Sequence, residues 1–396
     1  MSRARAETNT SFEWGCPPVP ELLERLTVRP EHDSRRYTPH MPARHHAGLP
    51  NSSGHTGGFA PTVKKYCAYL KQHPDDATAW EGLAYLHLRI AAGEGKGTNL
   101  GAEGLVTRQE SDDPLRAGHQ LLSFQYELQA LLREPDNLRF RGRLNTTLAL
   151  ALTDAQRENP YHRGHYVAIV RCLGGVGAAQ DLRYAIVEGS LDLRGRRPDL
   201  TDPLQEAELV CDLADLHRER GEHREALAMY ARALDLVHAA QAAGQRVYLR
   251  GPSTLYLWMH LSAMDLGDLA AAERYLDGME EAEREEDEVT RTEGEVPVFR
   301  GPASRLRLSL LEAQGRGQEA HELAVREADM HLERFRQSGD DWALFERANL
   351  LDYAGQHEQA RTLLERIVAG KESRGSAHGP AREALERLAR GERLVV

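Results

Sequence analysis

The chain has 396 residues, of which 41% are hydrophobic, enough to bury a substantial core. A formal net charge of -11 disfavours a general nucleic-acid binder, because phosphate binding needs a surplus of lysine and arginine on the contact surface. The cysteines at 16, 67, 172 and 211 are far apart, which argues against a disulfide framework or a C-x-x-C zinc site and favours a reducing cytoplasm.

The composition also indicates the kind of genome that encodes the chain and the compartment in which the protein is found. Positive charge comes almost entirely from arginine, and abundant alanine, leucine and glycine accompany it, as expected for translation of a GC-rich, bacterial genome. Neither a signal peptide nor a run of apolar residues long enough to span a membrane occurs in the sequence. The sequence therefore predicts a soluble, cytoplasmic protein that does not act at a membrane.

Residues 1–60 are predicted to form an irregular arm. The stretch "RPEHDSRRYTPHMPARHHAGLPNSSGHTGGFAP" is rich in proline, glycine, serine and histidine and has almost no apolar periodicity. We interpret its irregularly spaced histidines as solvated side chains rather than a loose metal site. The exception is "PPVPELLERLTV", in which Leu22, Leu23 and Leu26 predict a short amphipathic helix that docks on the main body.

Residues 61–160 are predicted to form divergent helical hairpins. In "TVKKYCAYLKQHPDDATAWEGLAYLHLRI", apolar residues recur at helical spacing on both sides of a Pro-Asp-Asp turn. A loop insert is expected over residues 93–114. Its glycine-rich "GEGKGTN" does not match a phosphate-binding loop, because Gly97 rather than serine or threonine follows Lys96.

Residues 161–370 contain a recurring pattern of small residues. The stretch "ERGEHREALAMYARAL" over residues 219–234 places Gly221 five residues before Ala226. The same step recurs at Gly267/Ala272, Gly315/Ala320 and Gly355/Ala360, and a weaker unit contains Tyr166, Ile169, Val170 and Gly177. We expect these small side chains to let the two helices of a hairpin approach closely.

This pattern resembles the tetratricopeptide repeat (TPR) family, with spacings longer than the 34 residues of its usual unit. The resemblance implies an all-α fold, namely a right-handed α-solenoid of antiparallel helix hairpins with an inner groove lined by the first helix of each pair. The acidic stretch over residues 280–297 is expected to be a loop. Residues 371–396 are expected to contain a polar capping helix.

The resemblance also implies which side chains line the groove. The first-helix positions of the family fall on Cys211, Asp215, Arg218, Leu257, Leu261, Met264, Trp342, Phe345, Asn349, Asp352 and Tyr353. An apolar and aromatic wall with scattered charges suits an amphipathic helix or an extended peptide of a protein partner. The alternative for the aromatic residues is that they simply pack between helices.

No group of residues in the sequence resembles a catalytic or metal site. His162 and His165 lack a third ligand, Glu327 and His331 do not form an H-E-x-x-H motif with His321, and no nucleophile elbow or dinucleotide fingerprint is present. The basic patch of Arg194, Arg196 and Arg197 is interpreted as a solvated loop. We therefore expect no catalytic residue, no cofactor and no metal.

Three functional hypotheses remain. The first is a peptide-binding scaffold or adaptor. The second is the sensory module of a bacterial transcriptional or signalling regulator, since "ENPYHRGHYVAIVRCLGGVGAAQDLRYAIVEGSLDL" is weakly similar to the bacterial transcriptional activator domain. No DNA-binding helix-turn-helix pattern precedes the repeats, so direct nucleic-acid binding is not expected. The third, a hydrolase or metalloenzyme, lacks the necessary residues.

Overall fold

The computed structural model describes residues 17–29, 60–91, 114–156, 166–197, 202–245, 247, 250–292, 302–370 and 377–394. These residues form sixteen α-helices and no β-strand, which confirms the expected all-α class. The chain divides into two compact units, residues 1–216 and 217–396. The boundary falls within helix α8 (Pro203–Glu219), and each unit is described by itself.

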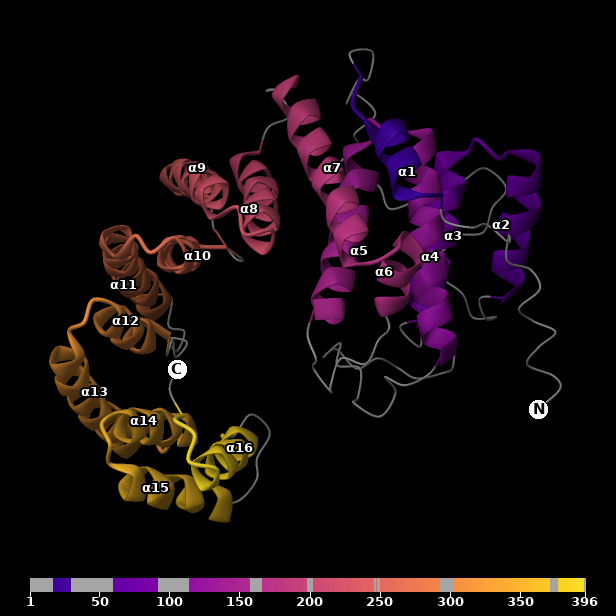
Figure 1. Ribbon diagram of the computed structural model, residues 1–396. Coiled ribbons are helices and arrows are strands. Elements are labelled where there is room, and N and C mark those ends of the chain that lie inside the picture. The colour runs from indigo at the N-terminus through magenta and orange to yellow at the C-terminus, as the bar shows by residue number, and fades with distance from the viewer. Residues whose placement is uncertain are drawn as a thin grey trace, which may run out of the picture. The chain divides into compact units, whose positions relative to one another are not determined.

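Unit 1 is a bundle of helices of unequal length. It contains α1 (Val19–Leu26), α2 (Ala60–Gln72), α3 (Ala77–Ala91), α4 (Pro114–Arg133), α5 (Leu138–Gln156), α6 (Val167–Leu173), α7 (Val176–Gly195) and most of α8. Helix α3 packs on α4, and α5 packs on α7 (Figure 1). The core between them contains the fully buried Phe124 and Tyr126.

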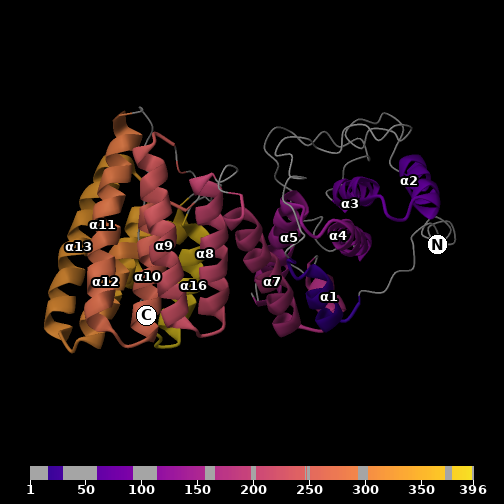
Figure 2. The same cartoon turned by 90° about the horizontal axis from the view of Figure 1, so that it is seen from above.

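Helix α1 confirms the short amphipathic helix predicted within the N-terminal arm. It packs against α7, beside which Figure 2 shows it, and Val19, Leu22 and Leu26 are buried. Its apolar residues recur at three- and four-residue steps, so they share one face of the helix. The other residues of the predicted arm, apart from 17–29 and Ala60, lie outside the described part, as does most of the predicted 93–114 loop.

The guanidinium of Arg141 ties α1 to the bundle. This side chain is completely buried, and it donates hydrogen bonds to the carbonyl oxygens of Leu26 and Pro135, both at 2.6 Å, and of Ile186 at 3.4 Å. Gly189 makes room for it, because a Cβ there would lie 2.5 Å from Nη1. Burial lowers the pKa of Arg141 to about 10, which leaves the group charged at neutral pH. One cation thus satisfies backbone carbonyls from three separate parts of the chain.

Unit 2 is a succession of helices, most of which pack on the next one in the chain (Figure 1). After the end of α8 come α9 (His223–Ala242), α10 (Pro252–Asp265), α11 (Leu269–Thr292), α12 (Pro302–Ala313), α13 (Gly317–Ser338), α14 (Asp341–Tyr353), α15 (His357–Ala369) and α16 (His378–Ala389). The last of these lies within the predicted capping region and packs on α15. Tight turns join α8 to α9, α10 to α11, α12 to α13 and α14 to α15.

The same turn recurs after each of these first helices. Its glycine has a positive φ of 73° to 76°, at Gly221, Gly267, Gly315 and Gly355, and Gly391 repeats the conformation after α16. At Gly267, for example, the following amide of Asp268 donates to the carbonyl of Ala263 at 3.0 Å. This is the Schellman arrangement, in which a left-handed residue closes the helix and satisfies its last carbonyls.

The structure corrects the reason given above for these glycines. A Cβ added at Gly221, Gly267, Gly315 or Gly355 would meet no atom within 4 Å, so close helix approach does not require glycine. Glycine is required instead by the left-handed backbone at these four positions. The partner alanines, in contrast, are fully buried, so close packing does explain Ala226, Ala272, Ala320 and Ala360.

The weaker repeat unit around Gly177 is also corrected. Gly177 lies inside α7, and the turn before that helix is made by Gly174 and Gly175, which have φ values of 98° and 123°.

The predicted loop over residues 280–297 is wrong for its first thirteen residues, because α11 continues to Thr292. Glutamate and arginine form helices well, and the acidic run contains no glycine or proline before Gly294. Ala282 is buried, and Glu286 accepts hydrogen bonds from the backbone amide and the hydroxyl of Ser253 at the start of α10. The acidic run is therefore the solvated side of a helix that packs on its neighbour.

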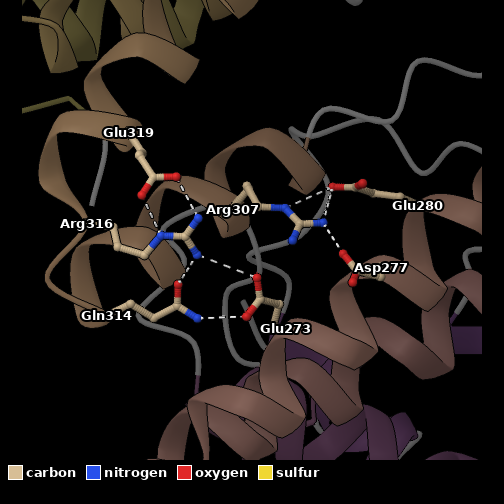
Figure 3. A network of polar contacts seen from close by, with 7 residues as sticks. All are labelled: Glu273, Asp277, Glu280, Arg307, Gln314, Arg316 and Glu319. Atoms are coloured by element: carbon tan, nitrogen blue, oxygen red, sulfur yellow. Dashed lines mark hydrogen bonds and ion pairs between the residues drawn. The ribbon is translucent and has the colours of Figure 1, made fainter.

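Two arginines of the hairpin formed by α12 and α13 join this hairpin to α11 (Figure 3). Arg307 on α12 donates to Asp277 at 2.6 Å and to Glu280 at 2.9 Å, both on α11. Arg316, in the next turn, lies 3.7 Å from Glu273. The carboxylates are 41% to 62% exposed, so these pairs orient neighbouring hairpins more than they stabilise them.

Candidate partner-binding surface

The structure places the predicted groove residues on three first helices. Cys211, Asp215 and Arg218 lie on α8; Leu257, Leu261 and Met264 lie on α10; Trp342, Phe345, Asn349, Asp352 and Tyr353 lie on α14. Asp215 belongs to unit 1 and Arg218 to unit 2, so the α8 residues are not treated as one site. Within unit 2, the residues on α14 come together with residues of α12.

Two aromatic rings stand at the start of α14. The Asp340 carboxylate caps this helix by accepting a hydrogen bond from the Trp342 amide at 3.0 Å. The rings of Trp342 and Phe345 meet edge to face, with centroids 5.7 Å apart and planes at 86°. Both side chains are half-buried against the alanine and leucine core of unit 2, so part of each remains accessible.

Two polar residues of α14 are buried instead. Asn349 is 4% exposed and Asp352 is 2% exposed. Oδ1 of Asp352 lies 2.6 Å from Nδ1 of His357, and Oδ2 accepts a hydrogen bond from the Leu394 amide at 2.9 Å. Asp352 therefore contacts the protein itself on both oxygens, and its role in partner binding stays a prediction.

Helix α12 supplies the charged neighbours of α14. Arg305 forms a two-pronged ion pair with the buried Glu346, with Nε 3.1 Å from Oε2. Burial and a hydrogen bond with Glu312 raise the pKa of Tyr353 to about 12, so its hydroxyl stays protonated. We call Arg305 and Glu312 together with Trp342, Phe345, Asp352 and Tyr353 the α12–α14 surface.

The α10 residues form a more apolar neighbourhood. Leu257 and Met264 are half-buried and pack against the small core cluster around Ala263. Leu261 is also half-buried. The Arg218 guanidinium at the end of α8 lies 4.5 Å from the ring centroid of Trp258, in cation–π geometry.

A buried ion network in unit 1 was not anticipated from the sequence. Arg143 on α5 lies 2.9 Å from Glu81 on α3 and 3.0 Å from Glu127 on α4, and Arg139 also contacts Glu81. Burial raises the pKa of Glu127, and the charge of Arg143 opposes that shift. Glutamates and arginines this far apart in sequence carry no local signal of contact. The network holds three helices together and involves none of the predicted site residues.

A second unanticipated contact joins two histidines of unit 1. Nδ1 of His87 on α3 lies 2.9 Å from Nδ1 of His119 on α4. His87 is 4% exposed, and burial, followed by the neighbouring His119, lowers its pKa to about 3. His87 is therefore neutral at pH 7.

Within the described ranges, no three histidine, cysteine, aspartate or glutamate side chains are grouped so that they could hold a metal ion. His331 is half-buried on α13, where burial lowers its pKa to about 4, whereas His162 and His165 lie outside the described residues. Of the helices that the structure describes, none combines the length and the apolar character needed to cross a membrane.

Comparisons with known proteins do not assign this surface. No model of a protein family matches the chain, and no curated protein sequence matches it significantly.

Proposed function

We propose that unit 2 is a right-handed TPR-like α-solenoid and that the chain is a cytoplasmic scaffold or adaptor that binds a protein or peptide on its first helices. One observation carries this proposal. The same glycine turn and buried alanine recur in successive hairpins, and the first helices α10 and α14 of these hairpins carry half-exposed aromatic and aliphatic side chains. Repeats of this kind form extended surfaces that grow with each added hairpin.

The chemistry of the α12–α14 surface supports a peptide ligand. Trp342 and Phe345 are large side chains already held in place by the core, so they lose little conformational freedom on binding. Aromatic anchors of this type contribute most of the affinity in many interfaces. Glu312 nearby offers a negative charge at an exposed position, which would orient a bound segment.

The proposal is tested by capture of a partner on the immobilised full chain from an extract of the source organism. The partner is identified by mass spectrometry, and its binding is then measured with purified protein. The double variant Trp342→Ala, Phe345→Ala should weaken binding by a factor of about 30 or more, as for the loss of interface anchors. Capture of a DNA-binding protein by this surface would favour the regulatory module over the scaffold.

The matched control is Met330→Ala. Met330 is the most exposed large hydrophobic residue among those described, at 59%, and it lies on the second helix α13. This variant should bind the partner as the unmodified chain does. Circular dichroism should show unchanged helicity for both variants. Equal binding by the well-folded double variant and the control would refute a binding role for α14.

A further inference from the structure

The chain turns back on unit 2 after α16. Gly391 has the left-handed φ of 75° seen in the earlier turns, and the Glu392 amide donates to the Arg387 carbonyl at 3.0 Å. In the earlier hairpins this turn leads into a second helix. Here residues 392–394 are not helical, and Figure 1 shows the chain running from α16 toward α14 and α12. We call residues 391–394 the C-terminal segment.

The C-terminal segment contacts the α12–α14 surface in two ways, and its leucine packs on the core of unit 2. The Leu394 amide donates to the buried Asp352 carboxylate at 2.9 Å. The Leu394 side chain is half-buried against the core cluster of unit 2. Nη1 of Arg393 lies 3.8 Å from the Glu312 carboxylate on α12. A main-chain hydrogen bond, an aliphatic contact and an ion pair are the usual elements of peptide recognition.

Asp352 is built to receive such a hydrogen bond. A carboxylate that is 2% exposed needs donors, because burial without them is costly. His357 provides one contact, at Oδ1, and the second oxygen is left for a backbone amide. An amide of any peptide chain has the same chemistry, so the Leu394 amide is replaceable. The neighbouring Glu312 and the apolar cluster would select which peptide replaces it.

The segment is held weakly enough to leave. Its ion pair joins side chains that are 67% and 48% exposed, and such pairs contribute little. The Arg387 side chain donates a hydrogen bond to the Arg393 carbonyl at 2.6 Å, and this bond joins the segment to α16 and not to α14. Release would remove one hydrogen bond from Asp352, which water or another peptide amide has to replace, and would uncover one half-buried leucine.

We propose that the α12–α14 surface binds a short peptide with a basic residue followed by an aliphatic residue, and that the C-terminal segment is its internal ligand. This inference rests on the proposed function and names the ligand class and its regulation. An external peptide binds only the fraction of molecules in which the segment has left, so the segment lowers the apparent affinity by that fraction.

The test uses a fluorescently labelled peptide of the sequence GERLVV, residues 391–396, and fluorescence anisotropy. The full chain carrying Arg393→Glu and Leu394→Asp, which release the segment, should bind the peptide at least about tenfold more tightly than the unmodified chain. The matched control is Arg390→Ala, since Arg390 pairs with Glu392 and has no contact of its own with α12 or α14 among those described. It should behave as the unmodified chain does.

A charge exchange keeps the proposal testable if the released variant folds poorly. Glu312 is exposed, so Glu312→Arg should leave the fold intact apart from the loss of the hydrogen bond with Tyr353. This variant should bind a peptide with Arg393→Glu more tightly than the natural peptide. The released variant, which keeps Glu312, should bind the natural peptide more tightly. Failure of both folded variants to bind either peptide, or equal binding by released and unmodified chains, would overturn the inference.

The outcomes separate this inference from the proposed function. If the peptide does not bind but partner capture still depends on Trp342 and Phe345, the surface is a binding site and the ligand class is wrong. If the peptide binds while capture is unaffected by the loss of both rings, the internal ligand stands and the partner uses another surface.

Discussion

Unit 1 and unit 2 are both helical, but they satisfy their buried backbone groups by different means. In unit 1, the buried Arg141 side chain donates to the carbonyls of Leu26 and Pro135, which lie far apart in the sequence. In unit 2, each first helix ends in a glycine turn that satisfies its own last carbonyls. A left-handed glycine also closes α6 in unit 1, but only unit 2 repeats such a turn from hairpin to hairpin among the described residues.

The placement of buried charge follows the same division. Unit 1 buries Arg141, Glu81 and Glu127 between helices that do not repeat. Unit 2 has its arginine pairs mainly at the surface and buries carboxylates on α14, at Glu346 and Asp352. Buried charge in unit 2 therefore coincides with the surface for which we propose a ligand.

The largest effect is expected for Arg141→Met in unit 1. The apolar side chain would leave the carbonyls of Leu26 and Pro135 buried without a donor, which should cost about 3 kcal/mol or more of unfolding free energy. Urea denaturation followed by circular dichroism measures the loss. Arg171→Met, at an exposed position of α6, is the matched control and should change stability by less than about 0.5 kcal/mol. Equal stability of the two variants would contradict the assigned role of Arg141.

An intermediate effect is expected from acid, through His87. The pKa of His87 is about 3 in the folded chain and about 6.5 when unfolded, so the unfolded state binds the proton first as pH falls. The contribution of neutral His87 to the free energy of unfolding is complete above pH 6.5. It is lost progressively below this pH, so that the free energy of unfolding falls by about 2 kcal/mol at pH 5. Urea denaturation at pH 7 and pH 5 should show a smaller pH dependence for His87→Gln than for the unmodified chain. The same dependence in both would show that burial does not lower the pKa of His87.

The smallest effect is expected in the turns of unit 2. Gly315→Ala places a Cβ on a left-handed backbone with φ of 75° and should cost about 1 kcal/mol, although no atom stands in its way. Gly317→Ala, two residues later at the start of α13, meets no strain and no neighbour within 4 Å, so it should stabilise by about 0.5 kcal/mol. Thermal melting compares the two. If both alanines had the same effect, the turn would not depend on its glycine.

Much of the secondary structure is predictable from the sequence because its causes are local. The step from Gly267 to Ala272 marks the turn between α10 and α11, and Leu22 and Leu26 mark the apolar face of α1. Local patterns also misled, since the acidic residues after 280 resembled a loop and continue α11. The high helix propensity of these residues is a local signal, whereas the contact between Glu286 and Ser253 that joins this part of α11 to α10 lies in no short window of sequence.

The all-α class, the position of the repeated turns and the aromatic residues at the start of α14 thus follow from local patterns in the chain. Which polar groups are buried and what they contact depends on how distant segments pack. Arg141 meets a carbonyl 115 residues away, and Asp352 meets an amide 42 residues away. Hydrogen bonds to backbone groups cannot be predicted from residue types, because every residue offers the same carbonyl and every residue except proline offers the same amide.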